Sequence, residues 1–285
     1  AIGSSPPVNL KGKHKLEYLE KRFPDGFSYA GDSAADLVIW AKASSAVLVG
    51  VSRSTRDAFV KLNCPVEYEA TRESPSLRHW LKLLRIHQWS KNILLFVPLI
   101  LGQAFLQYHA LLAVVIGFVA MGLVASGTYV VNDISDIVAD RLHQTKKRRP
   151  IACGVIDAGQ AFCVALVLIL SGFVIMATQS LPAAGWLLVY LIGTLSYSLF
   201  FKARAMIDVF VLGGLYTLRV VIGICLAGTQ FSHWLLIFSF FFFFALSMAK
   251  RHVEITKAAA RDGVEGQIKG RGYRTTDAPL TLAMG

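Results

Sequence analysis

Charged side chains are missing from two long stretches of this sequence. No Asp, Glu, Lys or Arg occurs in residues 92–132, and none occurs in residues 158–201. Buried helices of soluble proteins rarely continue that far without a charge, so a hydrophobic soluble core explains these stretches poorly. Six apolar runs are long enough to cross about 30 Å of hydrocarbon. They lie at roughly 92–107, 110–131, 161–178, 183–201, 208–228 and 232–249. The sequence therefore predicts an all-α polytopic membrane protein.

Cysteine is also scarce. The four cysteines, Cys64, Cys153, Cys163 and Cys225, form no CxxC pair and have no histidine at metal-ligand spacing. This pattern gives no support to a zinc site or a disulfide framework. We expect reduced thiols.

Acidic residues are fewer than basic ones, 18 against 29, which gives a net charge of +11. The two signs nearly balance before Arg78, with 10 basic and 9 acidic residues, whereas 19 basic residues face 9 acidic ones from Arg78 onward. The cations occupy short loops between apolar runs and form no groove or stripe, which argues against nucleic acid as a partner. They indicate anionic lipids or anionic substrates instead.

The loops alternate in charge. Those after the first, third and fifth apolar runs are short and carry no charged residue, whereas those after the second, fourth and sixth carry Lys and Arg. Cytoplasmic loops of membrane proteins are enriched in Lys and Arg. We therefore predict a multi-pass protein of the inner (plasma) membrane, with the basic loops on the cytoplasmic side.

An acidic motif lies where the second run ends, and it consists of Asn132, Asp133, Asp136 and Asp140. Steps of three and four residues place these side chains on one face of a helix. Stacked carboxylates repel one another unless a cation neutralises them, and Mg²⁺ prefers oxygen ligands completed by substrate phosphates. A basic run follows within ten residues: Lys146, Lys147, Arg148 and Arg149. Cations beside a metal site suit a diphosphate leaving group.

Two other interpretations of these charges stay open. The acids could be a solvated helix end and the basic run only a topology signal. Charged residues at membrane depth also mark transporters and channels. Against a transporter, the acids gather on one face and do not line a path across the membrane.

The segment Asn132–Asp140 resembles the NDxxDxxxD signature of the UbiA superfamily of intramembrane prenyltransferases. Three further blocks, at 84–92, 139–154 and 249–255, are similar to the branch that contains decaprenyl-phosphate phosphoribosyltransferase. The resemblance extends from about Leu77 to the end of the chain. It implies a helix bundle around a lipid-facing cavity, with six of the family's nine helices present, and Mg²⁺ held by Asp133, Asp136 and Asp140.

The resemblance also implies further substrate-binding residues. The predicted set is Lys91, Lys146, Arg148, Arg149, Tyr197, Lys202, Asp208, Arg219 and Lys250. Many relatives carry a DxxxD pair in the second polar region, whereas this sequence has Asp208 followed by Leu212. This difference favours the phosphoribosyl-transferring branch. Independently of the family, Arg219 lies in the middle of an apolar run, so we expect it to face the cavity and meet an acid or a phosphate.

The function that we expect is Mg²⁺-dependent transfer of a phosphoribosyl group from phosphoribosyl pyrophosphate to a polyprenyl phosphate. The alternative within the class is prenyl transfer from a polyprenyl diphosphate to an aromatic acceptor. In both cases the partners are an anionic diphosphate donor, a polyprenyl lipid and the membrane.

Residues 1–70 differ from the rest, because their mixed charge and α/β rhythm indicate a soluble segment. A helix is expected near 13–22 and a buried strand near 46–52, in a segment too short for a sheet of its own. The motif Gly31–Asp36 and the upstream Lys15 resemble the end of a haloacid dehalogenase-type phosphatase domain. The resemblance implies Mg²⁺ ligands at Asp32 and Asp36 and a phosphate contact at Lys15, so a phosphatase is a further alternative, although its nucleophile is absent. The predicted domains are 1–70, an amphipathic linker at 71–91, and a transferase domain at 92–285 that is truncated at its C-terminus.

Overall fold

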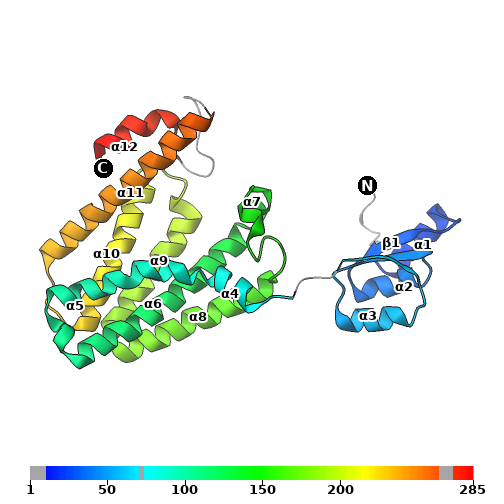
Figure 1. Ribbon diagram of the computed structural model, residues 1–285, viewed down its shortest axis with the longest axis horizontal. Coiled ribbons are helices and arrows are strands. Elements are labelled where there is room, and N and C mark those ends of the chain that lie inside the picture. Colours follow the sequence, from blue (N-terminus) through cyan, green and yellow to red (C-terminus); the bar gives the residue numbers. More distant parts are fainter. Residues whose placement is uncertain (1–10, 71–73, 263–271, 285) are drawn as a thin grey trace. The chain divides into compact units, whose positions relative to one another are not determined.

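The computed structural model describes residues 11–70, 74–262 and 272–284 (Figure 1). The chain divides into two units, Ala1–Ser74 and Pro75–Gly285.

The first unit is a small α/β structure. Strands β1 (Ser28–Gly31), β2 (Ser45–Val49) and β3 (Val66–Ala70) form a parallel sheet in the order β1-β2-β3. Its helices are α1 (Lys13–Arg22), η1 (Ala34–Asp36), α2 (Leu37–Trp40) and α3 (Arg53–Val60). The helix at 13–22 and the strand near 46–52 agree with the sequence prediction. The expectation that this segment is too short for its own sheet was wrong, because β3 pairs with β2 and Trp40, Leu48 and Phe59 supply a core.

Five helices of the second unit are long and apolar enough to cross a membrane. They are α6 (Tyr108–Ser135), α8 (Ala158–Gln179), α9 (Leu181–Ser196) continued by η5 (Tyr197–Phe201), α10 (Ile207–Ala227) and α11 (His233–Asp262). These helices agree with five of the six predicted spans. Helix α6 packs against α8, while α10 packs against α9, α11 and α6. The exposed side chains along α8 and α9 are mostly large and apolar, as contact with lipid requires.

The first predicted span is not a single helix. The chain there passes through the end of η2 (Ile86–Phe96), then α5 (Val97–Leu101) and η3 (Ala104–Leu106), and α4 (Leu77–Leu84) precedes η2. Arg85 and Gln103 have positive φ angles of 50° and 53°, and this left-handed backbone interrupts the helical path at both points. The predicted single helix at 92–107 was therefore wrong.

The segment predicted as a linker also packs on the bundle. Trp89 Nε1 donates a hydrogen bond to Ser126 Oγ at 2.9 Å, and Ser126 Oγ donates to the Leu84 carbonyl at 2.7 Å. Gly122 makes this contact possible, since a Cβ there would lie 2.5 Å from the indole of Trp89. Residues 75–91 therefore belong to the second unit, and they bring Arg85 and Lys91 to the end of α6.

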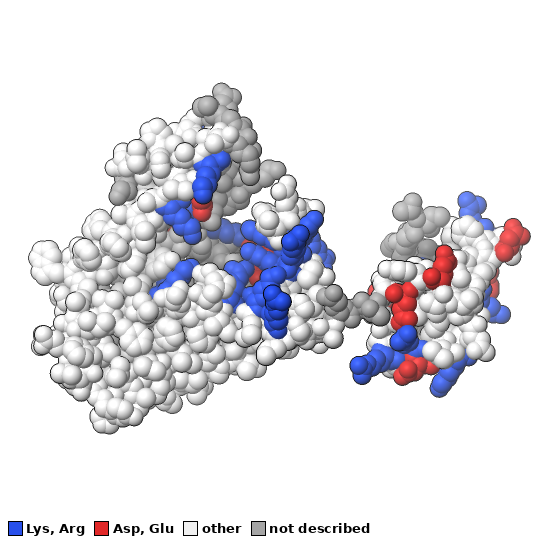
Figure 2. Space-filling view, viewed as in Figure 1, with Lys and Arg blue, Asp and Glu red and all other residues white. Residues whose placement is uncertain are grey.

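Short elements complete the end of the bundle where α6 stops and α10 begins. They are α7 (Ile137–Leu142), η4 (Lys146–Arg148), η6 (Thr275–Asp277) and α12 (Ala278–Met284). Lys and Arg gather around a hollow on the face of this unit shown in Figure 2, while much of the remaining visible surface carries none.

Candidate active site

The acidic motif lies at the end of α6 and continues into α7. The amide of Asp136 donates to the Asn132 carbonyl at 2.9 Å, and the amide of Asp140 donates to the Asp136 carbonyl at 2.8 Å. These bonds carry the helical path across the change of helix at Asp136. Asp133 and Asp140 consequently lie close together, and one guanidinium contacts both carboxylates.

That guanidinium belongs to Arg149. Its Nη1 lies 2.6 Å from Asp140 Oδ2 and 3.1 Å from Asp133 Oδ1. Asp133 also accepts a bond of 2.5 Å from Arg85 Nη2. Both carboxylates are buried, with Asp133 4% and Asp140 2% exposed. Buried carboxylates need such partners, since an isolated charge away from water is costly.

Asp136 has a different partner. Lys202 Nζ, from the loop between α9 and α10, lies 2.9 Å and 3.3 Å from its two carboxylate oxygens. The three carboxylates are thus paired with three cations, and each cation comes from a different part of the chain.

The residue types at this end fit Mg²⁺. No group of three or more His, Cys, Asp or Glu side chains within the described parts of the chain is already arranged as a metal site. The carboxylates are nevertheless the hard oxygen donors that Mg²⁺ requires. The cations that now neutralise them are suited to bind phosphate oxygens once a metal takes the carboxylates.

A cavity of about 190 Å³ adjoins the acidic motif. Its lining comes from η2, α6, α9, η5 and α10, and comprises Lys91, Thr128, Tyr129, Asn132, Tyr190, Thr194, Tyr197, Ser198, Leu212, Leu215, Tyr216 and Arg219. Only the two leucines lack a polar group. The cavity is therefore suited to a ligand with many hydrogen-bonding groups.

Arg219 faces this cavity, as its position in an apolar run predicts. It is 5% exposed and donates to Asn92 Oδ1 at 3.2 Å, to the Leu215 carbonyl at 2.9 Å and to Tyr190 Oη at 2.8 Å. Its guanidinium carbon also lies 4.9 Å from the ring centre of Tyr190 and 5.1 Å from that of Tyr216. These contacts fix the guanidinium, yet none of the three hydrogen-bond acceptors is a carboxylate.

Asp208 forms a buried contact of another kind. It is 0% exposed, and its Oδ2 lies 2.7 Å from Arg251 Nη2. Tyr273 donates to Asp208 Oδ1 at 2.7 Å and accepts a 2.8 Å bond from the Met206 amide. Burial and the bond to Asp208 raise the pKa of Tyr273 to about 12, so its hydroxyl stays protonated. We call these four residues the latch. Its geometry favours a structural role for Asp208, whose predicted contact with substrate stays a prediction.

The remaining predicted cations lie at the surface. Lys146 and Arg148 are exposed and make no ion pair within the described residues. The Arg148 carbonyl accepts a bond of 3.1 Å from Lys82 Nζ. Lys250 is exposed near Lys91, since its charge acts on that of Lys91. The structure thus brings Arg149 to the acids and leaves its two predicted neighbours in solvent.

Several lining residues were not predicted, notably Tyr129, Tyr190 and Tyr216. The sequence spacing of these residues could have indicated them. Tyr190, Thr194 and Tyr197 are separated by four and three residues, which places them on one helical face. Tyr216 and Arg219 are separated by three.

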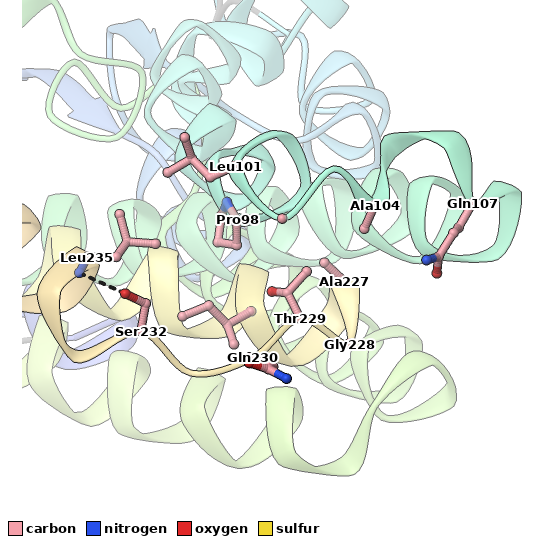
Figure 3. Close-up of a pocket in the computed structure, with 12 residues that line it drawn as sticks. Pro98, Leu101, Ala104, Gln107, Ala227, Gly228, Thr229, Gln230, Ser232 and Leu235 are labelled. Carbon is pink, nitrogen blue, oxygen red and sulfur yellow. Dashed lines mark hydrogen bonds between the residues drawn. The ribbon is translucent and has the colours of Figure 1, made fainter.

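A second, larger cavity of about 530 Å³ lies at the other end of the bundle (Figure 3). Its lining comes from the segment Pro98–Gln107, from the end of α10, from the residues between α10 and α11 and from the start of α11, and it contains no charged side chain. Ser232 Oγ accepts a 3.3 Å bond from the Leu235 amide there. Because α6 runs from this end to the acidic end, the larger cavity is remote from the carboxylates.

The first unit has a cavity of about 340 Å³ lined by residues of its predicted motif, including Lys15, Asp32 and Asp36. Lys15 Nζ donates to Tyr29 Oη at 3.0 Å, and Tyr29 Oη donates to Asp36 Oδ1 at 2.9 Å. Burial of Asp36 opposes ionisation, but bonds from Tyr29, Ser33 and Asp32 outweigh it and hold the pKa of this carboxyl below its ordinary value. The motif is thus gathered in one place, and its phosphatase-like role stays a prediction.

Comparison with known proteins places these features in a family context. The model of the UbiA prenyltransferase family matches residues 95–275. The uncharacterized protein y4nM of Sinorhizobium fredii is 46% identical over 285 residues, covering all of this chain and 55% of that protein. Decaprenyl-phosphate phosphoribosyltransferase of Corynebacterium glutamicum is 36% identical over 179 residues, covering 61% of this chain and 54% of that protein. The chain thus spans about half the length of these two relatives.

Solved structures agree on the fold. A UbiA homolog from Archaeoglobus fulgidus bound to GPP and Mg²⁺ matches with a TM-score of 0.57 at 18% identity, covering 72% of this chain and 71% of that one. At this identity the likeness supports the fold alone.

Proposed function

This chain belongs to the UbiA prenyltransferase family, and we propose that it transfers a phosphoribosyl group from phosphoribosyl pyrophosphate to a polyprenyl phosphate. The observation that carries the proposal is the polar lining of the cavity beside the acidic motif. A prenyl tail binds through buried apolar area, and it would leave hydroxyl and cationic groups without partners. A ribosyl ring offers hydroxyl groups to the same lining. The name of the Corynebacterium glutamicum relative, decaprenyl-phosphate phosphoribosyltransferase, supports the same transferred group and the same class of acceptor.

In the proposed reaction, the bond between ribose C1 and the diphosphate oxygen breaks, and pyrophosphate leaves with the bonding electrons. An oxygen of the polyprenyl phosphate then forms the new bond to C1, and the positive charge that develops on the sugar is cancelled. The products are a polyprenyl phosphate that carries 5-phosphoribose on its phosphate oxygen, and pyrophosphate. Negative charge develops on the leaving group, so preorganised cations beside it lower the barrier.

Arg85, Arg149 and Lys202 are placed for that role. Each is now held by a carboxylate of the acidic motif. Asp133, Asp136 and Asp140 would hold Mg²⁺, which would supply Lewis-acid stabilisation to the leaving diphosphate. The three cations would then contact the diphosphate oxygens, and Asn132, which lines the cavity, would orient the sugar.

The membrane orientation is also part of the proposal. The acidic motif, Lys202 and the basic run all lie at one end of the bundle, and the opposite cavity contains no charged side chain. By the positive-inside rule, we place the active site on the cytoplasmic face of the inner membrane.

The test uses membranes from cells that express the full-length protein, incubated with Mg²⁺, labelled phosphoribosyl pyrophosphate and a polyprenyl phosphate. We expect a labelled lipid, and pyrophosphate release only when the lipid phosphate is added. Membranes that carry Asp136→Asn serve as the control. Absence of the labelled lipid, together with transfer of a prenyl group from a polyprenyl diphosphate to a hydroxybenzoate, would reject the sugar donor.

A further inference from the structure

The cations near the cavity fall into two groups that differ in their partners. Arg85, Arg149 and Lys202 pair with carboxylates at distances of 2.5 to 3.1 Å. Lys91, Arg219 and Lys250 form no ion pair with a carboxylate among the described residues. The first group is neutral as it stands, whereas the second carries uncompensated positive charge.

The second group is also concentrated in space. Lys91 and Arg219 line the same cavity. The charges of Arg219, Lys250 and Arg85 all repel that of Lys91. Lys91 is half-buried and donates no hydrogen bond to a described protein atom. Holding an ammonium group among like charges and partly away from water is unfavourable, and an anion bound beside it would offset this cost.

Arg219 gives this group a fixed geometry. Its contacts with Asn92, Leu215 and Tyr190 use three N–H bonds, and a guanidinium has further N–H donors. Because the side chain is 5% exposed, those donors are not freely hydrated. A rigid guanidinium beside a lysine is the usual protein arrangement for binding phosphate oxygens.

We propose that Lys91 and Arg219 form a binding site for a phosphate monoester, separate from the carboxylate end that takes the metal-bound diphosphate. Because no carboxylate belongs to this site, binding there needs no metal. Under the proposed function, two reactants carry such a group: the donor through its 5-phosphate and the lipid acceptor through its terminal phosphate. Arg85 is close to both groups of cations, since it pairs with Asp133 and its charge acts on Lys91. The monoester would therefore lie next to the reacting diphosphate.

The experiment measures binding to the purified full-length protein in detergent with excess EDTA, which separates this site from the metal-dependent one. The probes are ribose 5-phosphate and farnesyl phosphate, each titrated alone. We expect at least one probe to bind, and Lys91→Met to weaken that binding about tenfold or more, as the loss of a charge-assisted hydrogen bond requires. Lys91→Arg should retain most of the affinity. The probe whose binding depends on Lys91 identifies the source of the phosphate, and dependence for both means that the site accepts either.

Lys257→Met is the matched control, because Lys257 is an exposed lysine of α11 and its removal changes the net charge equally. The proposal is overturned if neither probe binds in EDTA, if Lys91→Met binds as well as the parent protein, or if Lys257→Met weakens binding to the same extent. These results are independent of the proposed reaction. Lys91-dependent binding in a protein that transfers no sugar would reject the reaction and keep the site.

Discussion

The latch at the start of α10 allows a quantitative test. Asp208 is fully buried, and its carboxylate depends on Arg251 and Tyr273. Replacing Arg251 by Met keeps the apolar stem but removes the cation that lies 2.7 Å from the carboxylate. Removing one partner of a buried ion pair costs about 3–5 kcal/mol. Arg251 also pairs with Glu254, but that residue reaches solvent and its loss of a partner costs little.

This cost translates into a measurable change in melting temperature. For a domain of 150–250 residues, 1 kcal/mol shifts the melting temperature by about 2–4 °C, so Arg251→Met should melt about 6–20 °C below the parent protein. Tyr273→Phe removes the acceptor of the Met206 amide and one donor to Asp208, for a smaller cost of about 1–3 kcal/mol. The measurement is thermal unfolding of the detergent-solubilised protein by intrinsic fluorescence, at one scan rate for all variants.

The double variant Asp208→Leu with Arg251→Met is the decisive comparison. Replacing a buried ion pair by apolar side chains of similar size is often neutral or stabilising, so the double variant should regain most of the stability that Arg251→Met loses. Two results would refute the reasoning. One is an Arg251→Met protein that melts with the parent, and the other is a double variant less stable than Arg251→Met.

Three further predictions concern the active site and its orientation. Asp136→Asn should abolish sugar transfer without changing the melting temperature by more than about 4 °C, since the Asp136 carboxylate is partly solvated. EDTA should abolish the activity of the parent protein until Mg²⁺ is restored, and full activity in EDTA would contradict the metal assignment. Lys202→Ala should raise the apparent KM for phosphoribosyl pyrophosphate more than that for the lipid phosphate, measured by initial rates, and an equal rise in both would argue for a structural role. In a variant without native cysteines, Lys146→Cys should react with an impermeant thiol reagent only from the cytoplasmic side and Gln230→Cys only from the other side, so labelling of both from one side would overturn the topology.

The sequence predicts the long helices well because their signal is local. Charge-free apolar runs of sufficient length must form helices when they cross lipid, since no other partner exists for their backbone groups. The first span shows the limit of this argument. Its composition is apolar, but the chain changes from η2 to α5 at Val97, and left-handed backbone at Gln103 separates α5 from η3. These interruptions depend on packing against α6, and a hydropathy pattern carries no information about packing.

The candidate site is predictable to a similar extent. Helical spacing identifies the carboxylates, because Asp133, Asp136 and Asp140 are close in sequence. Their partners are not predictable from spacing, since the choice of cation is decided by tertiary structure. Within the basic run only Arg149 reaches the acids, while another partner, Lys202, arrives from a loop 66 residues away from Asp136.

Burial separates the cations that membrane topology requires from those that a ligand requires. A positive-inside signal needs only exposed charge in the loops, and Lys146 and Arg148 satisfy it at the surface. Topology gives no reason to bury Arg219 to 5% exposure or to hold Lys91 in a cavity among other cations. Such positions cost solvation energy, and a protein retains them where an anion restores the balance. The polar lining of the cavity and its uncompensated charge therefore both support the proposed substrate, which is polyhydroxylated and carries phosphate at more than one position.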